Sequence, residues 1–588
     1  MPMTDRLHGA RLLGPGATRF ALWAPDCRNV AVELMDGSLH PLAEEPGGWF
    51  GGELECGAGT GYRYVVDGDR RVPDPASRQQ VGDVHGFSLV VDAASYPWRM
   101  TDWRGRPWHE AVIYELHVGL LGGFAAVQAY LPALRDLGIT AVELMPLGEF
   151  PGRRNWGYDG VLPFAPDSSY GTPDELRSLV DRAHQLGLMV LVDVVCNHFG
   201  PEGNYLGHYA SDFFRSDRQT PWGDGIDFRR PQVREFFIEN ALMWLQDYRM
   251  DGLRLDAVHA IGDRAFMLEL AERVRSTLCR RRHLHLVLEN EANEASLLER
   301  GYDAQWNDDG HNALHVLLTG EHHGYYADFA EDAAGKLATC LAEGFAYQGQ
   351  ANRHGHARGE PSAHLPPSAF VLFLQNHDQV GNRAHGERLP VLTDPDALKA
   401  ATVLLLLSPM IPLLFMGEEW ACARPFLYFT DHPDELGQAV GDGRRDEFAE
   451  FPAFTDASLR ECIPDPNSAS TFDRCLPDLD RVNQSRHRQT LAFYRDLLGL
   501  RHGHVIPRLP GSHALESSVL GSHAVAAAWR MGDGTRLDIL INLGESPVAM
   551  NRISANAEVL YAYRVRGIDL TQGLLPPRSA LALLEPAS

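Results

Sequence analysis

Short apolar runs alternate with segments of helical spacing through the middle of the chain. The run at 112–117 is followed by Val127, Leu131 and Leu134, which recur at helical spacing and stop at Gly138. This rhythm of strand and helix indicates a parallel sheet with helices outside it. The other predicted strands are 139–145, 189–193, one that begins at Gly252, 285–289, a less distinct one near 304–306, 370–375 and 411–416.

Two segments carry further local signals. Thr172, Pro173 and Glu175 match a capping box with proline in the first turn, so a helix is predicted to begin there and to end at Gly187. The longest apolar run, 401–416, is short for a membrane span and contains two prolines. We therefore interpret it as a buried helix that turns into a strand.

Both ends of the chain have a different pattern. Residues 20–25, 30–34 and 62–66 are alternating or apolar runs between turn signals, and Asp67-Gly68 is typical of a hairpin. Strand-like runs return at 525–530, 536–542 and 580–584. We predict an N-terminal β-sandwich at 1–97, a central catalytic domain at 98–500 and a C-terminal antiparallel β domain at 501–588.

Composition narrows the class of protein. A chain of 588 residues is expected to form two or three domains, and 44% hydrophobic and 22% charged residues are ordinary for a globular enzyme. The net charge of −25 argues against nucleic acid or an anionic membrane as a partner. The first residues lack an apolar signal-peptide core, and the eight cysteines are scattered without close pairs. These features predict a cytoplasmic protein with reduced thiols.

Four of the predicted strands end in polar, ionisable residues. They are followed by Asn197 and His198, by Asp256, by Glu289, and by the sequence Asn-His-Asp that ends at Asp378. Arg254 lies two positions before Asp256, so both side chains point to the same side of the strand. A neighbouring cation keeps a carboxylate ionised, as a nucleophile requires. Taken alone, this pair is equally compatible with a structural ion pair.

Together these strand ends resemble the four motif regions of the α-amylase superfamily of glycoside hydrolases. Four further motifs narrow the resemblance: Trp156-Gly-Tyr-Asp-Gly160, Asn197-His-Phe-Gly-Pro-Glu-Gly-Asn-Tyr205, Asp256-Ala-Val-His-Ala-Ile261 and Gln375-Asn-His-Asp-Gln-Val-Gly-Asn-Arg383. They resemble the maltooligosyltrehalose trehalohydrolase family within the superfamily. This resemblance implies a (β/α)8 TIM barrel with an immunoglobulin-like N-terminal sandwich.

The resemblance assigns the catalytic roles residue by residue. It implies that Asp256 is the nucleophile, Glu289 the general acid and base, and Asp378 a third carboxylate that grips sugar hydroxyls. Glu289 is expected to have a raised pKa, because an acid must hold its proton near neutral pH. Glu291 competes for this role, but Glu289 is the first polar residue after the strand.

Substrate-binding residues are implied in the same way. His198 and His377 match histidines that bind the sugar next to the cleaved bond, Tyr158 matches an aromatic that stacks on it, and Arg254 belongs to the same site. Asp193 is interpreted as an orienting residue. Trp222 is our candidate for the trehalose side of the site, with loop packing as an equally good alternative.

The expected reaction is hydrolysis of the α-1,4 bond next to a terminal trehalose unit in an α-glucan. No cofactor and no required metal are implied, and the expected pathway partner is a maltooligosyltrehalose synthase. One alternative on the same scaffold is an α-1,4-glucan branching transferase. A non-enzymatic glucan-binding scaffold is the other, although three intact carboxylates argue against it.

Overall fold

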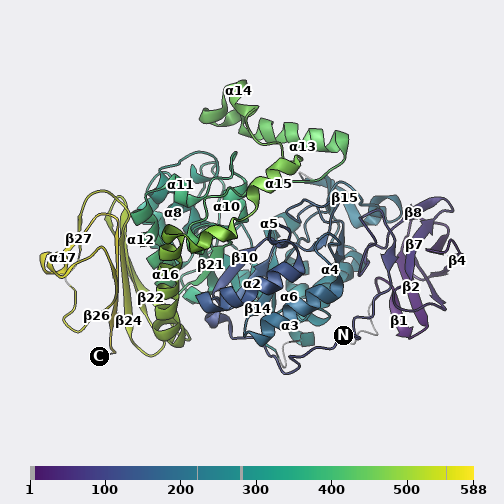
Figure 1. Ribbon diagram of the computed structural model, residues 1–588, viewed down its shortest axis with the longest axis horizontal. Coiled ribbons are helices and arrows are strands. Elements are labelled where there is room, and N and C mark those ends of the chain that lie inside the picture. The colour runs from purple at the N-terminus through teal and green to yellow at the C-terminus, as the bar shows by residue number, and fades with distance from the viewer. Residues whose placement is uncertain (1–6, 221–222, 279–281, 551–552, 588) are drawn as a thin grey trace.

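The protein is elongated, with a β-rich unit at each end of a central barrel (Figure 1). The computed structural model describes residues 7–220, 223–278, 282–550 and 553–587. The N-terminal strands lie at one end of the long axis and the C-terminal strands at the other, with the barrel between them. Within these described residues, no helix is both long and apolar enough to cross a membrane.

The centre is a closed barrel of eight parallel strands, as the sequence predicted. The indistinct sixth strand is present and pairs with both of its neighbours. The strands are β10 (Ile113–Leu116), β11 (Ala141–Leu144), β14 (Met189–Val194), β17 (Gly252–Leu255), β18 (His285–Leu288), β19 (Ala304–Trp306), β20 (Phe370–Phe373) and β21 (Ile411–Phe415).

Helices surround the barrel, and their starts follow the sequence signals. The Thr172 hydroxyl accepts from the Glu175 N–H while the Glu175 carboxylate accepts from the Thr172 N–H, which confirms the capping box. The apolar run at 401–416 forms the end of a helix and the last barrel strand. The long helices are α2 (Phe124–Leu137), α3 (Pro173–Gln185), α4 (Pro231–Gln246), α6 (Arg264–Leu278), α8 (Asp308–Thr319), α9 (Ala333–Glu343), α12 (Pro395–Leu407) and α16 (Ser485–Leu500).

Short elements follow several strands on the carboxyl side of the barrel. They include α1 (Val118–Leu121), α5 (Val258–Ile261), α7 (Ala295–Leu298), α10 (His377–Gly381) and α11 (Leu389–Leu392), and the pair β12 (Gly148–Glu149) and β13 (Leu162–Pro166).

The N-terminal unit consists of two antiparallel sheets, as expected of a sandwich. Asp67 and Gly68 both have positive φ and connect two paired strands, which confirms the predicted hairpin. One sheet contains β1 (Arg11–Gly14), β2 (Ala17–Trp23), β6 (Trp49–Leu54) and β5 (Ala43–Glu45); the other contains β4 (Leu39–Pro41), β3 (Val30–Leu34), β7 (Gly61–Val66), β8 (Arg70–Val72) and β9 (Ser88–Leu89).

The C-terminal unit is a five-stranded antiparallel sheet that lies against α12 and α9 of the barrel. Its strands are β22 (His513–Gly521), β23 (Ala524–Arg530), β24 (Arg536–Asn542), β28 (Ser579–Glu585) and β26 (Glu558–Tyr563). Beside them lie β25 (Val548–Ala549), β27 (Leu574–Leu575) and α17 (Gly567–Gln572). The domain boundaries themselves stay a prediction.

Two features were not predicted. A helical projection of α13 (Asp434–Glu447), α14 (Ala457–Arg460) and α15 (Ala469–Cys475) stands away from the barrel in Figure 1. In addition, the irregular segment after the third barrel strand contains a hairpin of β15 (Phe214–Thr220) and β16 (Gly223–Ile226). Its strands are polar without apolar alternation, so the hydrophobic pattern carried no signal for them.

Candidate active site

The three predicted catalytic carboxylates lie at the carboxyl ends of barrel strands. Asp256 follows β17, Glu289 follows β18, and Asp378 lies in α10 just after β20. The N–H of Ala257 donates to Glu289 Oε2 at 2.5 Å and so joins the first two strand ends. Ala257 has φ of 41°, a left-handed conformation that a non-glycine residue rarely adopts.

The Arg254 side chain lies close to Asp193, Asp256 and Glu289. It is fully buried, and its Nη1 donates to Asp193 Oδ2 and to Asp256 Oδ1, both at 2.7 Å. Its Nη2 lies 3.8 Å from Glu289 Oε2. The guanidinium stacks over the Trp306 ring, 4.3 Å from the ring centroid. The pairing of Arg254 with Asp256 that the strand period predicted is therefore present, with Asp193 as a further partner.

A chain of hydrogen bonds continues from Asp193 across the site. Tyr158 donates its hydroxyl proton to Asp193 Oδ2 at 2.6 Å, and His377 Nε2 lies 2.7 Å from the same hydroxyl oxygen. His377 Nδ1 in turn lies 2.5 Å from Glu115 Oε1. The rings of Tyr158 and His377 also stack, at 5.1 Å between centroids. The interpretation of Asp193 as an orienting residue agrees with these contacts.

Burial and neighbouring charges distinguish Glu289 from the nearby Glu291. Burial, together with the charges of Asp256, Asp308 and Asp378, raises the pKa of Glu289 well above its usual range, and the opposing effect of Arg254 is smaller. Glu289 is therefore held protonated, as a general acid must be. The competing Glu291 side chain is 72% exposed and lies 3.9 Å from His259. Glu289 is thus the buried carboxyl group with a raised pKa, whereas Glu291 lies at the surface.

His377 is the charged histidine of the site. Burial alone would lower its pKa, but the negative charges of Asp378 and Glu115 outweigh burial and raise the pKa to about 9. In its protonated form both ring nitrogens donate, one to Glu115 and one to the Tyr158 oxygen. Asp378 Oδ1 lies 3.4 Å from Nε2, and its side chain is 39% exposed.

The other predicted substrate-binding residues are His198, Tyr158 and Trp222. His198 is buried, which lowers its pKa, and its ring nitrogens contact Asn197 Oδ1 and the Tyr158 carbonyl. A sugar hydroxyl would have to replace one of these contacts. Tyr158 lies at the centre of the site and is partly exposed. Trp222 lies outside the described residues, so its role on the trehalose side stays a prediction.

Sequence reasoning missed three acidic residues of this site. Glu115 on β10 contacts His377, and Glu143 on β11 is fully buried with a pKa raised well above its usual range by burial and by Glu115. Burial and Asp378 raise the pKa of Asp308 to about 7. Charged residues inside apolar barrel strands were the available signal for the first two, because such residues are rarely fully buried unless they are paired.

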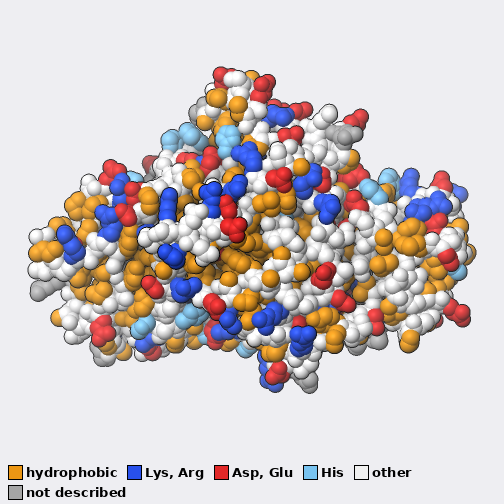
Figure 2. Space-filling model, viewed as in Figure 1, with side chains coloured by type: hydrophobic (Ala, Val, Ile, Leu, Met, Phe, Trp, Pro, Cys, Tyr) orange, Lys and Arg blue, Asp and Glu red, His pale blue; other side chains and the backbone are white. Residues whose placement is uncertain are grey.

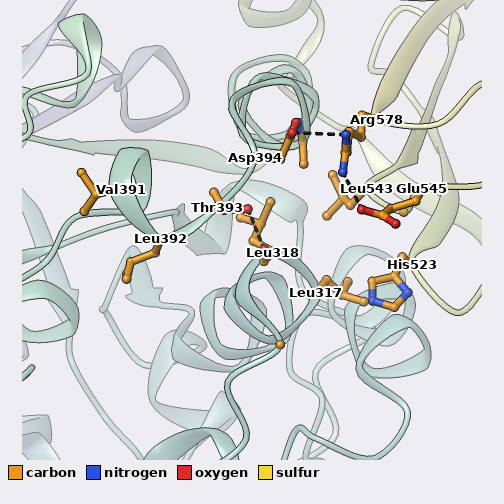
Figure 3. A pocket seen from close by; sticks show the side chains of 13 residues that line it. Leu317, Leu318, Val391, Leu392, Thr393, Asp394, His523, Leu543, Glu545 and Arg578 are labelled. Atoms are coloured by element: carbon orange, nitrogen blue, oxygen red, sulfur yellow. Dashed lines mark hydrogen bonds and ion pairs between the residues drawn. The ribbon is translucent and has the colours of Figure 1, made fainter.

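A separate cavity of about 670 Å³ lies between the barrel helices α8, α11 and α12 and the C-terminal sheet (Figure 3). Arg578 crosses it, with ion pairs to Asp394 at 3.2 Å and Glu545 at 2.7 Å. None of the three catalytic carboxylates lines this cavity. Its charged groups satisfy each other, so it shows no sign of a second catalytic site.

The surface shown in Figure 2 mixes acidic, basic and apolar side chains. Among the described side chains on that face, no extended basic patch is visible.

A closed parallel barrel with three carboxyl groups, Asp256, Glu289 and Asp378, at the carboxyl ends of its strands has the arrangement of a catalytic domain of the α-amylase class. The family described as "Alpha amylase, catalytic domain" matches residues 95–223, and a domain of unknown function, DUF3459, matches residues 512–582. A putative α-amylase from Salmonella typhimurium has a similar structure, with a TM-score of 0.92 and 41% identity over 99% of this chain and 100% of that one. A pullulanase from Anoxybacillus with 17% identity and a TM-score of 0.73 shares the fold.

Similarity to curated proteins narrows the class. The malto-oligosyltrehalose trehalohydrolase of Deinococcus radiodurans is 40% identical over 90% of both chains. That of Saccharolobus solfataricus is 38% identical over 84% of this chain and 86% of its own. The chain belongs to the malto-oligosyltrehalose trehalohydrolase family.

Removal of the buried cation should destabilise the protein. Arg254→Met leaves Asp193 and Asp256 buried together without their shared partner, and loss of one side of such a group costs about 3–5 kcal/mol of unfolding free energy. Urea denaturation measures this change. In the matched control Arg135→Met, an exposed ion pair with Asp136 is lost, at a cost below about 1 kcal/mol. Equal stability of the two variants would show that Arg254 does not hold the site together.

Stability should also depend on the charge of His377. Its folded-state pKa of about 9 lies above the usual 6.5, so protonated His377 stabilises the folded protein fully below pH 6.5. This contribution is lost as the pH rises through about 9. Thermal melts at several pH values should therefore show a loss of stability in the wild type that is smaller in His377→Gln. Identical pH profiles would contradict the assignment of charge.

Proposed function

We propose that the protein is a retaining glycoside hydrolase that releases trehalose from maltooligosyltrehalose. It would cleave the α-1,4-glucosidic bond next to the terminal trehalose unit and leave a shortened maltooligosaccharide. The names of its relatives supply this substrate. The observation that carries the chemistry is that one buried guanidinium contacts Asp256 and lies near a protonated Glu289.

In the first step, Glu289 donates its proton to the glycosidic oxygen as the bond to the anomeric carbon breaks. Asp256 attacks that carbon and forms a covalent glycosyl-enzyme, so trehalose leaves with the transferred proton. The hydrogen bond from Arg254 holds the Asp256 carboxyl group in place for this attack. The Ala257 N–H fixes the Glu289 carboxyl group beside the nucleophile.

In the second step, Glu289 acts as a base. It takes a proton from water, the resulting hydroxide oxygen attacks the anomeric carbon, and Asp256 is released as a carboxylate. Glu289 thereby regains the proton that it donated. Asp378, with its exposed oxygen and its position beside charged His377, is placed to hold hydroxyls of the distorted sugar.

The proposed substrate implies a pathway partner. Trehalose at a chain terminus must first be made by isomerisation of the reducing end of an α-glucan. A maltooligosyltrehalose synthase would supply this reaction, and we propose it as the enzyme that acts immediately before this one.

A branching transferase is the alternative with some support. A 1,4-α-glucan branching enzyme from Rhodospirillum rubrum is 34% identical, but over only 42% of this chain and 38% of its own. In that reaction a sugar 6-hydroxyl replaces water in the second step. This match covers much less of the chain than the matches to the trehalohydrolases, which favours hydrolysis.

Product analysis distinguishes these reactions. Maltotriosyltrehalose and maltopentaose are linear chains of equal length, and only the first ends in trehalose. We expect rapid release of free trehalose from the first and slow attack on the second, measured by chromatography of the sugars. Equal attack on both would indicate an α-amylase-like hydrolase, and new α-1,6 branches in a longer glucan would indicate the transferase.

The acid role can be tested with a neighbouring control. Glu289→Gln removes the proton donor and should lower kcat by about 10²–10⁴-fold. Wild-type kcat/KM should also fall as the pH rises through the raised pKa of Glu289, because the acid must be protonated. Glu291→Gln, at an exposed position, should change kcat by less than about threefold. If kcat fell more in Glu291→Gln than in Glu289→Gln, Glu291 would be the acid and Glu289 would not.

A further inference from the structure

The hairpin of β15 and β16 stands apart from the barrel strands as a two-stranded sheet of its own. Its base is packed, since Phe214 contacts the Phe199 and Phe213 rings and Ile226 is buried. An isolated two-stranded hairpin is only marginally stable in water. Its outer half therefore needs a tether if it is to hold a fixed position.

Arg218 provides such a tether. From the outer half of β15, its Nη1 donates to the Ile261 carbonyl at 2.6 Å, and its Nη2 donates to the Ala260 carbonyl. Both carbonyls belong to the end of α5. Among the described residues, Arg218 forms no ion pair with a carboxylate, so its charge is directed at the end of this short helix.

The end of α5 is shaped to receive this guanidinium. Gly262 follows directly, with φ of 63°, and a Cβ atom at this position would overlap the Arg218 guanidinium. The backbone conformation favours glycine at this position, and a Cβ atom would in addition force the Arg218 guanidinium to move. The contact between hairpin and α5 therefore depends on residues from both sides.

The position of α5 shows which part of the reaction this contact serves. The helix begins at Val258, immediately after Ala257, whose N–H holds the Glu289 carboxyl group. His259 of α5 accepts from the Glu291 N–H at 3.2 Å. Under the proposed function Glu289 delivers its proton to the leaving group, so α5 lies next to the residue that holds the group which meets the leaving oxygen.

We propose that Arg218 is a positioning residue that sets the preference for a trehalose leaving group by holding the β15–β16 hairpin against α5. This inference rests on the proposed function, because it concerns the choice of leaving group at the same site. Arg218 acts through the hairpin and takes no part in the bond-breaking steps.

The test measures kcat/KM for maltotriosyltrehalose and for maltopentaose, and the ratio of the two is the readout. In Arg218→Gln the ratio should fall by about 10- to 100-fold, since a displacement of about 1 Å in substrate positioning has effects of this size. Arg218→Lys keeps the positive charge with less directional hydrogen bonding, and it should retain an intermediate ratio.

Two further variants isolate the contact. Gly262→Ala displaces the guanidinium from the opposite side and should lower the ratio as Arg218→Gln does. Arg215→Gln is the matched control, because Arg215 lies on the same strand and pairs with exposed Asp217 at 2.8 Å. It should leave the ratio within about twofold of the wild type.

The outcomes separate the two proposals. A clear wild-type preference that survives both Arg218→Gln and Gly262→Ala overturns the role of Arg218 and leaves the proposed function intact. A parallel loss on both substrates also overturns it, because Arg218 would then only support the nucleophile loop. A wild-type enzyme without any preference for the trehalose-terminated chain overturns the proposed function and this inference together.

Discussion

The site depends on one buried ion pair group, Arg254 with Asp193 and Asp256. A guanidinium with no exposed surface is costly to desolvate, and it is tolerated here because two carboxylates accept from its Nη1 at 2.7 Å. The parallel register places Asp193 on β14 directly beside Arg254 on β17. The direct pairing of these two strands therefore brings the partners together, and Asp256, which follows β17, lies at the rim of the barrel.

The acids around Arg254, Asp193 and Asp256 differ in burial and in the charges beside them. Glu289 keeps its proton because it is largely buried and surrounded by other acids, while the more exposed Asp378 lies beside a charged histidine. A continuous chain from Glu115 through His377 and Tyr158 reaches Asp193, so groups on four barrel strands or their loops are connected. A change at one end of this chain is therefore expected to affect the nucleophile at the other.

Much of the fold could be predicted because its elements carry strong local signals. Apolar runs with the right spacing gave all eight barrel strands, and the capping box at Thr172 gave a helix start. The two-residue period of a strand predicted that Arg254 and Asp256 point to the same side, where they form a hydrogen bond. The hairpin bearing Arg218 and the helical projection could not be predicted, because their strands and helices are polar and mostly exposed. Glu115 and Glu143 were missed because strand patterns show burial but not which partner a charged residue finds across a barrel.

The central claim is that Asp256 forms a covalent bond to the sugar. The most direct test is to incubate the enzyme with 5-fluoro-α-glucosyl fluoride, an activated sugar whose glycosyl-enzyme hydrolyses slowly, and to locate the label by mass spectrometry of peptides. We predict one added glycosyl group on the peptide that contains Asp256, and none in Asp256→Asn. A label on another carboxylate, or turnover without any covalent species together with inversion at the anomeric carbon, would contradict the account.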